Sequence, residues 1–220
     1  MPPSFDLLLA TAYAPPVSFF SRLYSYQGKR IGLEAHEHYL KQSYRNRCYI
    51  LGPNGVQPLS IPVELPQGTK TPITEVRLST HGQWRSVWHQ TLATAYGASP
   101  YYEYYIDELE ALWSASEDDS LWGLNLRLLQ HLCPLLEIDP ACLCPTEDFT
   151  PLECHEADYR YSLRPKQGTL PPAYLPQAYH QLDRPARGFV PELSILDLLF
   201  NMGPESPLIL QASYHPYPHE

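Results

Sequence analysis

Long apolar runs and abundant charge are both missing from this 220-residue sequence. No segment approaches the roughly 18 consecutive apolar residues that a membrane-spanning helix needs. Charged residues make up only 18% of the chain, against about 25% in an average globular protein. The net charge of −9 argues against nonspecific nucleic-acid binding, which requires neutralisation of phosphates. We therefore expect neither a membrane span nor a nucleic-acid partner.

An export signal and paired metal-binding cysteines are also lacking. The start, MPPSFDLLLA, has no basic region, and its apolar run is shorter than the core of a signal peptide. Five cysteines without such a signal predict reduced thiols and a cytoplasmic location. The run from Cys133 through Cys142 and Cys144 to Cys154-His155 contains no C-x₂-C pair of the kind found in structural zinc sites. We expect no metal and no other cofactor, with zinc at these cysteines as the less favoured alternative.

Proline and tyrosine are present in excess, with 24 and 17 copies. Prolines interrupt regular structure, so we expect short strands and helices joined by long ordered loops. The chain is 44% hydrophobic, which suffices for one substantial core, and we predict a single domain over residues 1–220. Residues 139–192 carry little periodicity and are interpreted as a proline-rich ordered excursion that could include one short strand.

Hydrophobic periodicity predicts strands in the first part of the chain and helices afterwards. The expected strands cover residues 5–12, 29–34 and 73–79, and a hairpin joins residues 46–51 to 56–63. The expected helices cover residues 17–26, 84–96, about 100–113, 120–137 and a stretch from Ser194 to the Gly203-Pro204 stop. Ser194 and Asp197 match a capping box, in which Asp197 would accept a hydrogen bond from the backbone N–H of Ser194.

This order of elements predicts the fold class. We expect an α/β single domain with a mixed sheet, an N-terminal strand–loop–helix unit, a β-hairpin and a helical second half. The hairpin argues against a purely parallel sheet.

The main candidate site is a basic stretch interleaved with tyrosine, HEHYLKQSYRNRCYI, at residues 36–50. In an extended segment Arg45 and Arg47 would share one face, where two guanidiniums repel each other unless an anion lies between them. A phosphate, diphosphate or carboxylate could accept paired hydrogen bonds from both, with Lys41 as a third positive group. The alternative is that each arginine pairs with one of the 24 acidic side chains.

Proton transfer at this site would fall to a neighbouring histidine or carboxylate. His38 and Glu37 are candidates for a general base, and His89 is a third. His36 and His38 would also share a strand face and could hold zinc, but no distant histidine completes a recognised site.

Other polar and aromatic residues could line the pocket. Tyr44 and Asn46 would orient polar groups of the ligand, and Tyr13 follows the first expected strand. The loop at residues 13–16 has no glycine, and its prolines lack N–H groups, which disfavours a dinucleotide or P-loop cradle. Trp84 and Trp88 could stack on a sugar or base, although packing in the core is the more common role at helical spacing.

Five longer motifs carry a resemblance to a known family. They are Y-x-P-P-x-x-x-F at 13–20, E-x-Y-x-K-Q-S-Y-R-N-R-C at 37–48, L-x-I-P-V at 59–63, S-P-Y-x-E-Y-Y at 99–105 and G-F-x-P-x-L-S-I-x-D-L-L-F-N-x-G-P-E at 188–205. Together they resemble the WbqC-like protein family, in its short Bacteroides-type variant. Residues 114–179 carry no matching motif.

The resemblance implies a role in glycan assembly, since members occur in surface-polysaccharide (O-antigen) gene clusters. It suggests an acyl, aminoacyl or glycan-related transferase that acts on a phosphorylated or nucleotide-activated sugar. Such a ligand would fit a clamp of Lys41, Arg45 and Arg47. The alternative is a non-catalytic protein that binds a ligand or partner in a cytoplasmic assembly.

Overall fold

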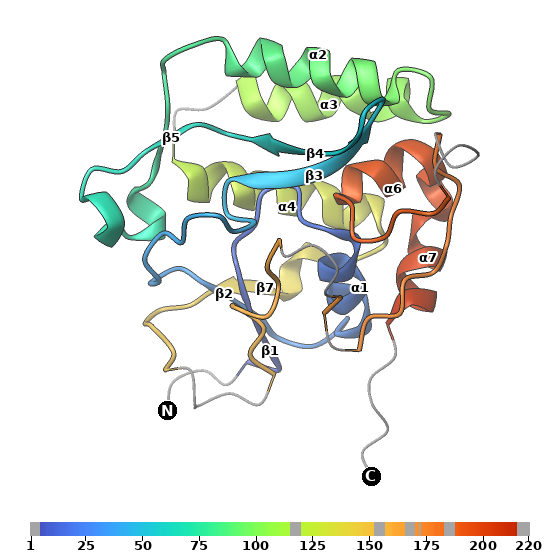
Figure 1. The fold of residues 1–220 in the computed structure, drawn as a ribbon. Coiled ribbons are helices and arrows are strands. Elements are labelled where there is room, and N and C mark those ends of the chain that lie inside the picture. Colours follow the sequence, from blue (N-terminus) through green and yellow to red (C-terminus); the bar gives the residue numbers. More distant parts are fainter. Residues whose placement is uncertain are drawn as a thin grey trace.

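The computed structural model describes residues 5–114, 120–151, 157–165, 170–171, 173–182 and 188–214. Its strands are β1 (Leu7–Ala10), β2 (Ile31–Glu34), β3 (Arg47–Gly52), β4 (Gly55–Ser60), β5 (Val63–Glu64), β6 (Arg77–Leu78) and β7 (Leu143–Pro145). Its α-helices are α1 (Val17–Ser25), α2 (Trp84–Tyr96), α3 (Tyr102–Ser114), α4 (Leu121–Leu135), α6 (Ile195–Met202) and α7 (Ser206–Ser213). The predicted α/β class is confirmed, with strands first and helices mostly in the second half (Figure 1).

A small parallel sheet forms the lower part of the molecule in Figure 1. β1 pairs with β2, with Leu7 opposite Ile31, and β2 pairs with β7, with Ile31 opposite Leu143. Every residue of β1 and β2 is buried, which is typical of parallel strands covered on both faces. Leu8 adds a parallel bridge to Asp158, so a segment from the second half extends the sheet beyond β1.

The predicted hairpin is confirmed as β3 and β4, with Arg47 opposite Ser60. It lies below α2 and beside α6 in Figure 1, and β3 contacts both helices. Gly55 has a φ of 112° at the turn, a conformation that favours glycine. The strand predicted at 73–79 is wrong for most of its length, because Ile73–Glu75 form a 3₁₀ turn after Pro72. Only β6 remains of it.

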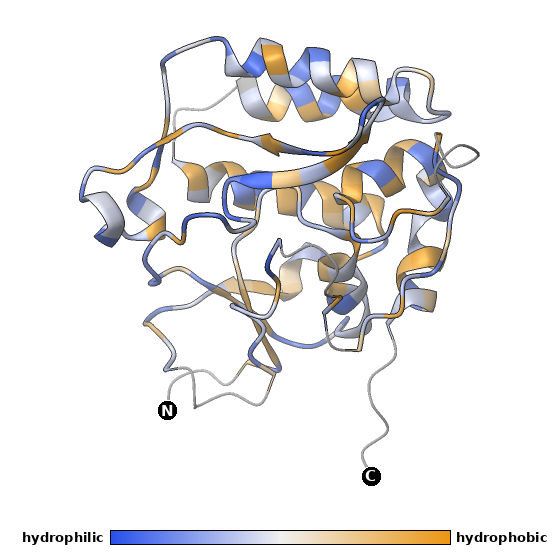
Figure 2. Ribbon diagram, viewed as in Figure 1, coloured by the Kyte–Doolittle hydropathy of each residue, from blue (hydrophilic) through white to orange (hydrophobic). Residues whose placement is uncertain are grey.

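The helices enclose one hydrophobic core that draws on residues from Leu7 to Leu210. α2 spans the predicted residues 84–96, and α3 and α4 begin one or two residues after the predicted starts. The hydroxyl of Ser120 accepts a hydrogen bond from the Gly123 N–H and caps α4. Broad hydrophobic bands mark α4 and α6, whereas α2 alternates hydrophobic and hydrophilic residues (Figure 2).

The capping box predicted at α6 is half right. The Ser194 hydroxyl accepts from the Leu196 N–H (3.3 Å) and donates to the Ala14 carbonyl (2.7 Å), so Ser194 is the N-cap. Its backbone N–H, however, donates to the Tyr49 carbonyl (2.7 Å) rather than to Asp197. The Asp197 carboxylate instead accepts hydrogen bonds from a cluster of buried polar side chains, described below.

The proline-rich excursion at 139–192 contains one short strand, β7, preceded by a 3₁₀ turn at Pro140–Cys142. Residues 152–156, 166–169, 172 and 183–187 lie outside the described part, and so does the alternative zinc ligand pair Cys154-His155. Among the helices that the structure describes, none has the length and apolar character needed to cross a membrane.

Candidate functional site

A turn-rich segment crosses the carboxyl ends of β1 and β2. Residues 41–46 form successive turns and bends between β2 and β3. The Tyr44 carbonyl accepts a hydrogen bond from the Tyr13 N–H (2.8 Å), just beyond β1. The Arg45 carbonyl accepts from the side-chain amide of Asn125 on α4 (2.8 Å). The segment is therefore fixed at the edge of a parallel sheet where ligands of α/β proteins bind.

Arg45 and Glu37 form a buried ion pair within this segment. The Arg45 Nε donates to Glu37 Oε1 (3.0 Å), and Nη2 donates to Oε2 (2.8 Å). The two side chains are 2% and 1% exposed, so water does not screen the pair. Of the two possibilities considered for the arginines, Arg45 therefore follows the second: it pairs with an acidic side chain of the protein. The extended geometry expected for Arg45 and Arg47 is wrong, because Arg45 lies in a turn and β3 begins only at Arg47.

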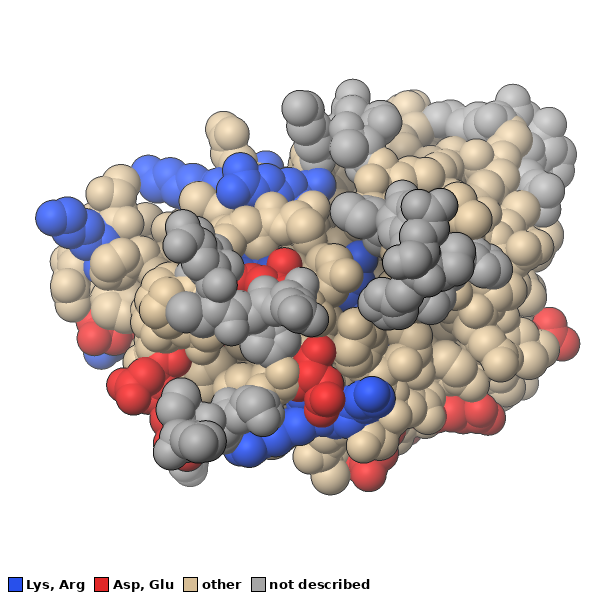
Figure 3. All heavy atoms as spheres, turned by 90° about the horizontal axis from the view of Figure 1, so that it is seen from below, with Lys and Arg blue, Asp and Glu red and all other residues tan. Residues whose placement is uncertain are grey.

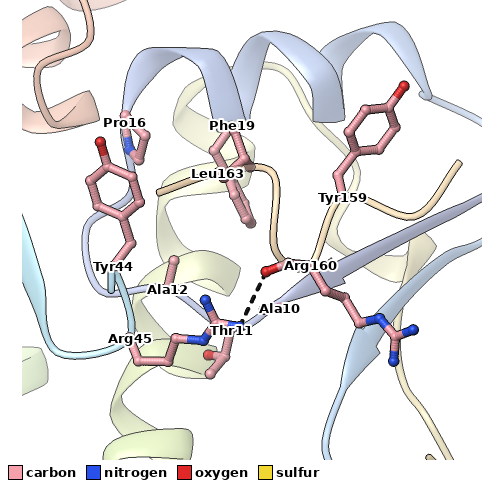
Figure 4. A pocket seen from close by; sticks show the side chains of 10 residues that line it. All are labelled: Ala10, Thr11, Ala12, Pro16, Phe19, Tyr44, Arg45, Tyr159, Arg160 and Leu163. Carbon is pink, nitrogen blue, oxygen red and sulfur yellow. Dashed lines mark hydrogen bonds between the residues drawn. The ribbon is translucent and has the colours of Figure 1, made fainter. Parts of the chain in front are cut away.

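A second buried arginine lies next to the first. Arg160 donates from Nη1 to Glu34 Oε2 (2.5 Å) and from Nη2 to Asp158 Oδ2 (2.6 Å). Its carbonyl accepts a hydrogen bond from the Arg45 Nη2 (3.2 Å), which links the two ion pairs. Figure 4 shows this bond and shows the Arg160 guanidinium pointing away from Arg45. Glu34 is the last residue of β2, and Asp158 bridges Leu8 of β1, so the ion pairs connect β2 to the segment that extends the sheet beyond β1.

Three carboxylates and two guanidiniums make up this group, which we call the ionic network: Glu34, Glu37, Asp158, Arg45 and Arg160. Both guanidiniums lie within 6 Å of the Tyr161 ring centroid (5.7 and 5.8 Å). Burial of ion pairs is costly, and apolar side chains of similar size often stabilise a fold as well or better. A network retained at this edge of the sheet is therefore a candidate functional site.

Arg47 differs from the two network arginines. Its Nε is buried and has no hydrogen-bond partner among the described residues. Tyr39 lies near both Arg47 and Arg45: burial raises the pKa of its phenol, and the two positive charges oppose that shift. Arg47 therefore has an unsatisfied buried donor, in a neighbourhood that includes Tyr39.

The other expected ligand-binding residues take different positions. Lys41 is exposed in the turn before Arg45, and the Asn46 side-chain amide donates to the Ile61 carbonyl (2.8 Å). Tyr13 is fully buried and packs edge-on against Trp88 (5.9 Å between ring centroids), so it belongs to the core. Tyr44 lines a small hollow beside Arg45.

That hollow lies between the end of β1, the start of α1 and the segment around Arg160 (Figure 4). It leaves about 10 Å³ for the centres of water-sized molecules. This is room for about one water. In this conformation the hollow cannot hold a sugar.

The proposed proton-transfer residues are not brought together. Glu37 is held by Arg45, and His38 is exposed beside it. His89 lies on α2 and contacts Glu110 of α3, at the top of Figure 1 and away from the parallel sheet. His36 is exposed, and its Nε2 contacts the Thr146 carbonyl (3.1 Å). Glu37 is itself a member of the ionic network, His38 is its neighbour in sequence, and the His36 backbone N–H donates to Glu34 of the network (2.9 Å).

The described residues contain no group of three or more His, Cys, Asp or Glu side chains arranged to hold a metal ion. Cys133 is buried, and burial raises the pKa of its thiol to about 12. Trp88 packs against Trp113 in the core, in the more common role that its helical spacing suggests.

Sequence reasoning missed two buried carboxylates outside the network. The Glu192 carboxylate accepts from the Ser18 hydroxyl (2.5 Å) at the first turn of α1, and burial raises its pKa to about 7. The Asp197 carboxylate accepts from Tyr96 and Tyr179, and burial raises its pKa to about 6. Glu192 is 174 residues from Ser18, and no local pattern could have predicted that contact. Asp197 was noticed in the sequence, but it was interpreted only as part of a capping box with Ser194.

The face seen from below carries both acidic and basic side chains, interspersed among uncharged ones (Figure 3). Where this face is described, neither sign of charge forms a broad continuous field.

These features define an α/β protein with a small parallel sheet and a buried ionic network at the carboxyl ends of its strands. The chain belongs to the WbqC-like protein family, whose model matches residues 11–153. The resemblance inferred from the motifs is thereby confirmed. The match includes Glu34, Glu37 and Arg45 and ends before Asp158 and Arg160. No curated protein and no solved structure matches the chain.

Proposed function

We propose that this protein is a transferase that acts on a phosphorylated or nucleotide-activated sugar in surface-polysaccharide biosynthesis. One observation carries the proposal: the buried Nε of Arg47 lacks a partner among the described residues, beside Tyr39 and the ionic network. A buried guanidinium donor left unpaired is costly, and a phosphate or carboxylate oxygen would satisfy it. Membership of the WbqC-like family supports a glycan-related substrate.

Within this proposal, the ionic network has a positioning role. Glu37 holds Arg45 through two hydrogen bonds, and Arg45 in turn holds the Arg160 carbonyl. Glu37 is thus already engaged and would not act as the general base. The exposed imidazole of His38, one residue away, is the better candidate to accept a proton from an attacking amine or hydroxyl.

The anion would bind at Arg47, with Lys41 as a second cation on the adjoining turn. The closed hollow beside Arg45 supports this choice, because it has no room for a sugar phosphate. Tyr39 would donate a hydrogen bond from its phenol, which burial keeps protonated at neutral pH.

The test is a thermal-shift screen with sugar phosphates and nucleotide sugars, followed by calorimetric titration of each ligand that binds. We expect Arg47→Ala to weaken binding at least tenfold and Arg47→Lys to restore it only in part, because lysine lacks the planar fork. Arg77→Ala is the matched control, since Arg77 is an exposed arginine on β6. Equal affinity in all four proteins would refute the proposed anion site.

A non-catalytic binding protein is the second candidate function, and the Glu37–Arg45 pair favours it. Because the two side chains bind each other, Arg45 is no longer free to bind an anion and Glu37 is no longer free to act as a base. The two functions are distinguished by incubating a bound ligand with amino-sugar acceptors and searching for products by mass spectrometry. Binding without turnover across these acceptors would favour the second candidate. A product that His38→Ala abolishes would favour the transferase.

A further inference from the structure

A second pocket lies at the opposite end of β3 from Arg47. It has a volume of about 150 Å³ and is bounded by the end of β3, the last turn of α2 and the first turn of α6. Four lining residues are apolar, namely Leu51, Pro53, Ala95 and Leu182, and three carry polar side-chain groups, namely Thr94, Tyr96 and Asp197. Five residue steps along β3, at roughly 3.3 Å each, separate this pocket from the proposed anion site.

The Asp197 carboxylate is held in place from three directions. Its Oδ1 accepts from the Tyr96 hydroxyl (3.0 Å), and its Oδ2 accepts from the Tyr179 hydroxyl (2.7 Å) and the Gln181 Nε2 (3.1 Å). The side chains come from α2 and from the segment at 173–182, so tertiary packing fixes the cluster. A carboxylate has about four acceptor positions, and three are used here, which leaves one on Oδ1.

The donors around Asp197 are all uncharged. The residue is 1% exposed, and no lysine or arginine among the described residues forms an ion pair with it. Burial raises the pKa of Asp197 to about 6, and the bonds from Tyr179, Tyr96 and Gln181 oppose that shift. Asp197 lies in the first turn of α6, where the partial positive charge of the helix N-terminus offsets part of the carboxylate charge. At neutral pH the carboxylate is still mostly ionised, without a full counter-charge.

We propose that this pocket binds the ammonium group of a small primary amine, with Asp197 as its counter-ion. An ammonium carries the charge that the cluster lacks and can donate to the free position on Oδ1. The apolar walls would receive a short carbon chain. A cavity of about 150 Å³ holds a molecule of roughly the size of benzene, so the ligand is small.

The competing explanation is that Asp197 only ties α2, α6 and the 173–182 segment together. The two explanations differ in how the wild-type protein treats two ligands of equal size and different charge. A purely structural carboxylate gives no preference for an amine over an alcohol. A carboxylate that acts as a counter-ion makes the protein prefer the amine, and that preference depends on whether Asp197 is ionised.

The first experiment uses the unaltered full chain with propylammonium chloride and 1-propanol as probes, titrated by NMR chemical-shift perturbation. At pH 7.5 we expect the amine to bind at least tenfold more tightly than the alcohol, with shifts centred on Leu51, Ala95 and Leu182. At pH 5 the preference should shrink severalfold, because Asp197 becomes protonated, whereas an alkylamine, with a pKa of about 10, stays charged.

Other titrating groups near Asp197 do not explain such a change. Among the described residues, the titratable groups that face Asp197 or its partners are Tyr96, Tyr179 and Cys48, and His180, between Tyr179 and Gln181, is exposed to solvent. Burial raises the pKa of both tyrosines well above the usual value and raises the Cys48 pKa to about 12. None of the three titrates between pH 5 and pH 7.5.

The second experiment removes the charge. Asp197→Asn should abolish the preference for the amine, whereas Asp107→Asn, on the exposed face of α3, should leave it unchanged. Tyr179→Phe keeps the carboxylate and should retain the preference.

Equal affinity of the wild type for amine and alcohol, or binding of neither, would overturn the proposal even if Asp197→Asn fails to fold. Neither result depends on the anion site at Arg47, so the proposed function stands or fails separately.

Discussion

The guanidinium of Arg45 has its charge neutralised by a single carboxylate, that of Glu37, at a site closed to water. Removal of one partner strands the other as an uncompensated buried charge, whereas removal of both leaves an apolar gap that similar-sized side chains can fill. The stability of single and double variants should therefore differ in a characteristic way.

We predict that Glu37→Leu lowers the free energy of unfolding by about 3–5 kcal/mol. The double variant Glu37→Leu/Arg45→Met should be less destabilised than Glu37→Leu alone, because it carries no stranded charge. Urea denaturation of the wild type, both single variants and the double variant provides the measurement. Additive losses in the double variant would mean that the pair is not energetically coupled.

At the scale of elements, the sequence predicted regular structure well and irregular structure poorly. α2 was predicted at 84–96 and found there, because tryptophan, leucine and alanine recur on one face over more than three turns. Arg45 and Arg47 were expected to share one face of an extended segment, but residues 41–46 form turns and bends, and Gln42 has a φ of 56°. This difference decided the candidate site, since side-chain alternation places Arg45 and Arg47 together only in a strand.

Long-range partners were beyond the reach of local patterns. Arg160 pairs with Glu34 across 126 positions of sequence, in a region without a family motif. The pattern of the basic stretch predicted an anion site, and that stays a prediction. It did not reveal that a carboxylate inside the same stretch, Glu37, already neutralises one arginine.

The junction between α6 and the following 3₁₀ turn (Gly203–Glu205) gives a prediction at this scale. Gly203 has a φ of 52°, and a Cβ added there would lie 2.5 Å from a ring carbon of Tyr101. Gly28 also has a positive φ, 73°, but an added Cβ would meet nothing within 4 Å. An L side chain would be strained at either positive φ, and only at Gly203 would an added Cβ also meet a neighbouring ring.

Gly28→Ala should cost about 1–2 kcal/mol from backbone strain alone, and Gly203→Ala should cost clearly more because the Tyr101 ring must also move. Thermal and urea denaturation of the two variants, side by side, test this difference. A Gly203→Ala variant as stable as Gly28→Ala would show that the ring moves freely and that packing at this junction is loose.

At the scale of the whole molecule, the buried carboxylate of Glu192 connects the first helix to a segment near residue 192, and it makes the stability of the fold depend on pH. Its carboxylate bonds Ser18 of α1, and its pKa is raised by burial from 4.5 to about 7. The folded protein therefore binds a proton at Glu192 more tightly than the unfolded chain does. This contribution to stability is complete below pH 4.5 and is lost as pH rises to 7.

Glu192→Gln should remove that loss. We expect its melting temperature to gain on the wild type between pH 5 and pH 8, because glutamine can still accept from Ser18 and never ionises. The charged and titratable groups around Glu192 are Arg22, Tyr44 and Tyr174, and burial raises the pKa of both tyrosines, so neither competes in this range. A difference between the two proteins that stays constant with pH would contradict the raised pKa.

The bonds that close the first β–α unit also set an order of events during synthesis. Leu8 donates to the Ala157 carbonyl (3.0 Å), Val17 donates to the Leu193 carbonyl (3.0 Å), and Ile195 donates to the Pro15 carbonyl (2.9 Å). A ribosome adds roughly 5–20 residues per second, so these partners emerge about 7–36 seconds after the segment that needs them. Throughout that interval Leu8 lacks its partners in the segment around Asp158, on the side of β1 that faces away from β2. We therefore expect the nascent chain to need protection from aggregation until almost all of it has been translated.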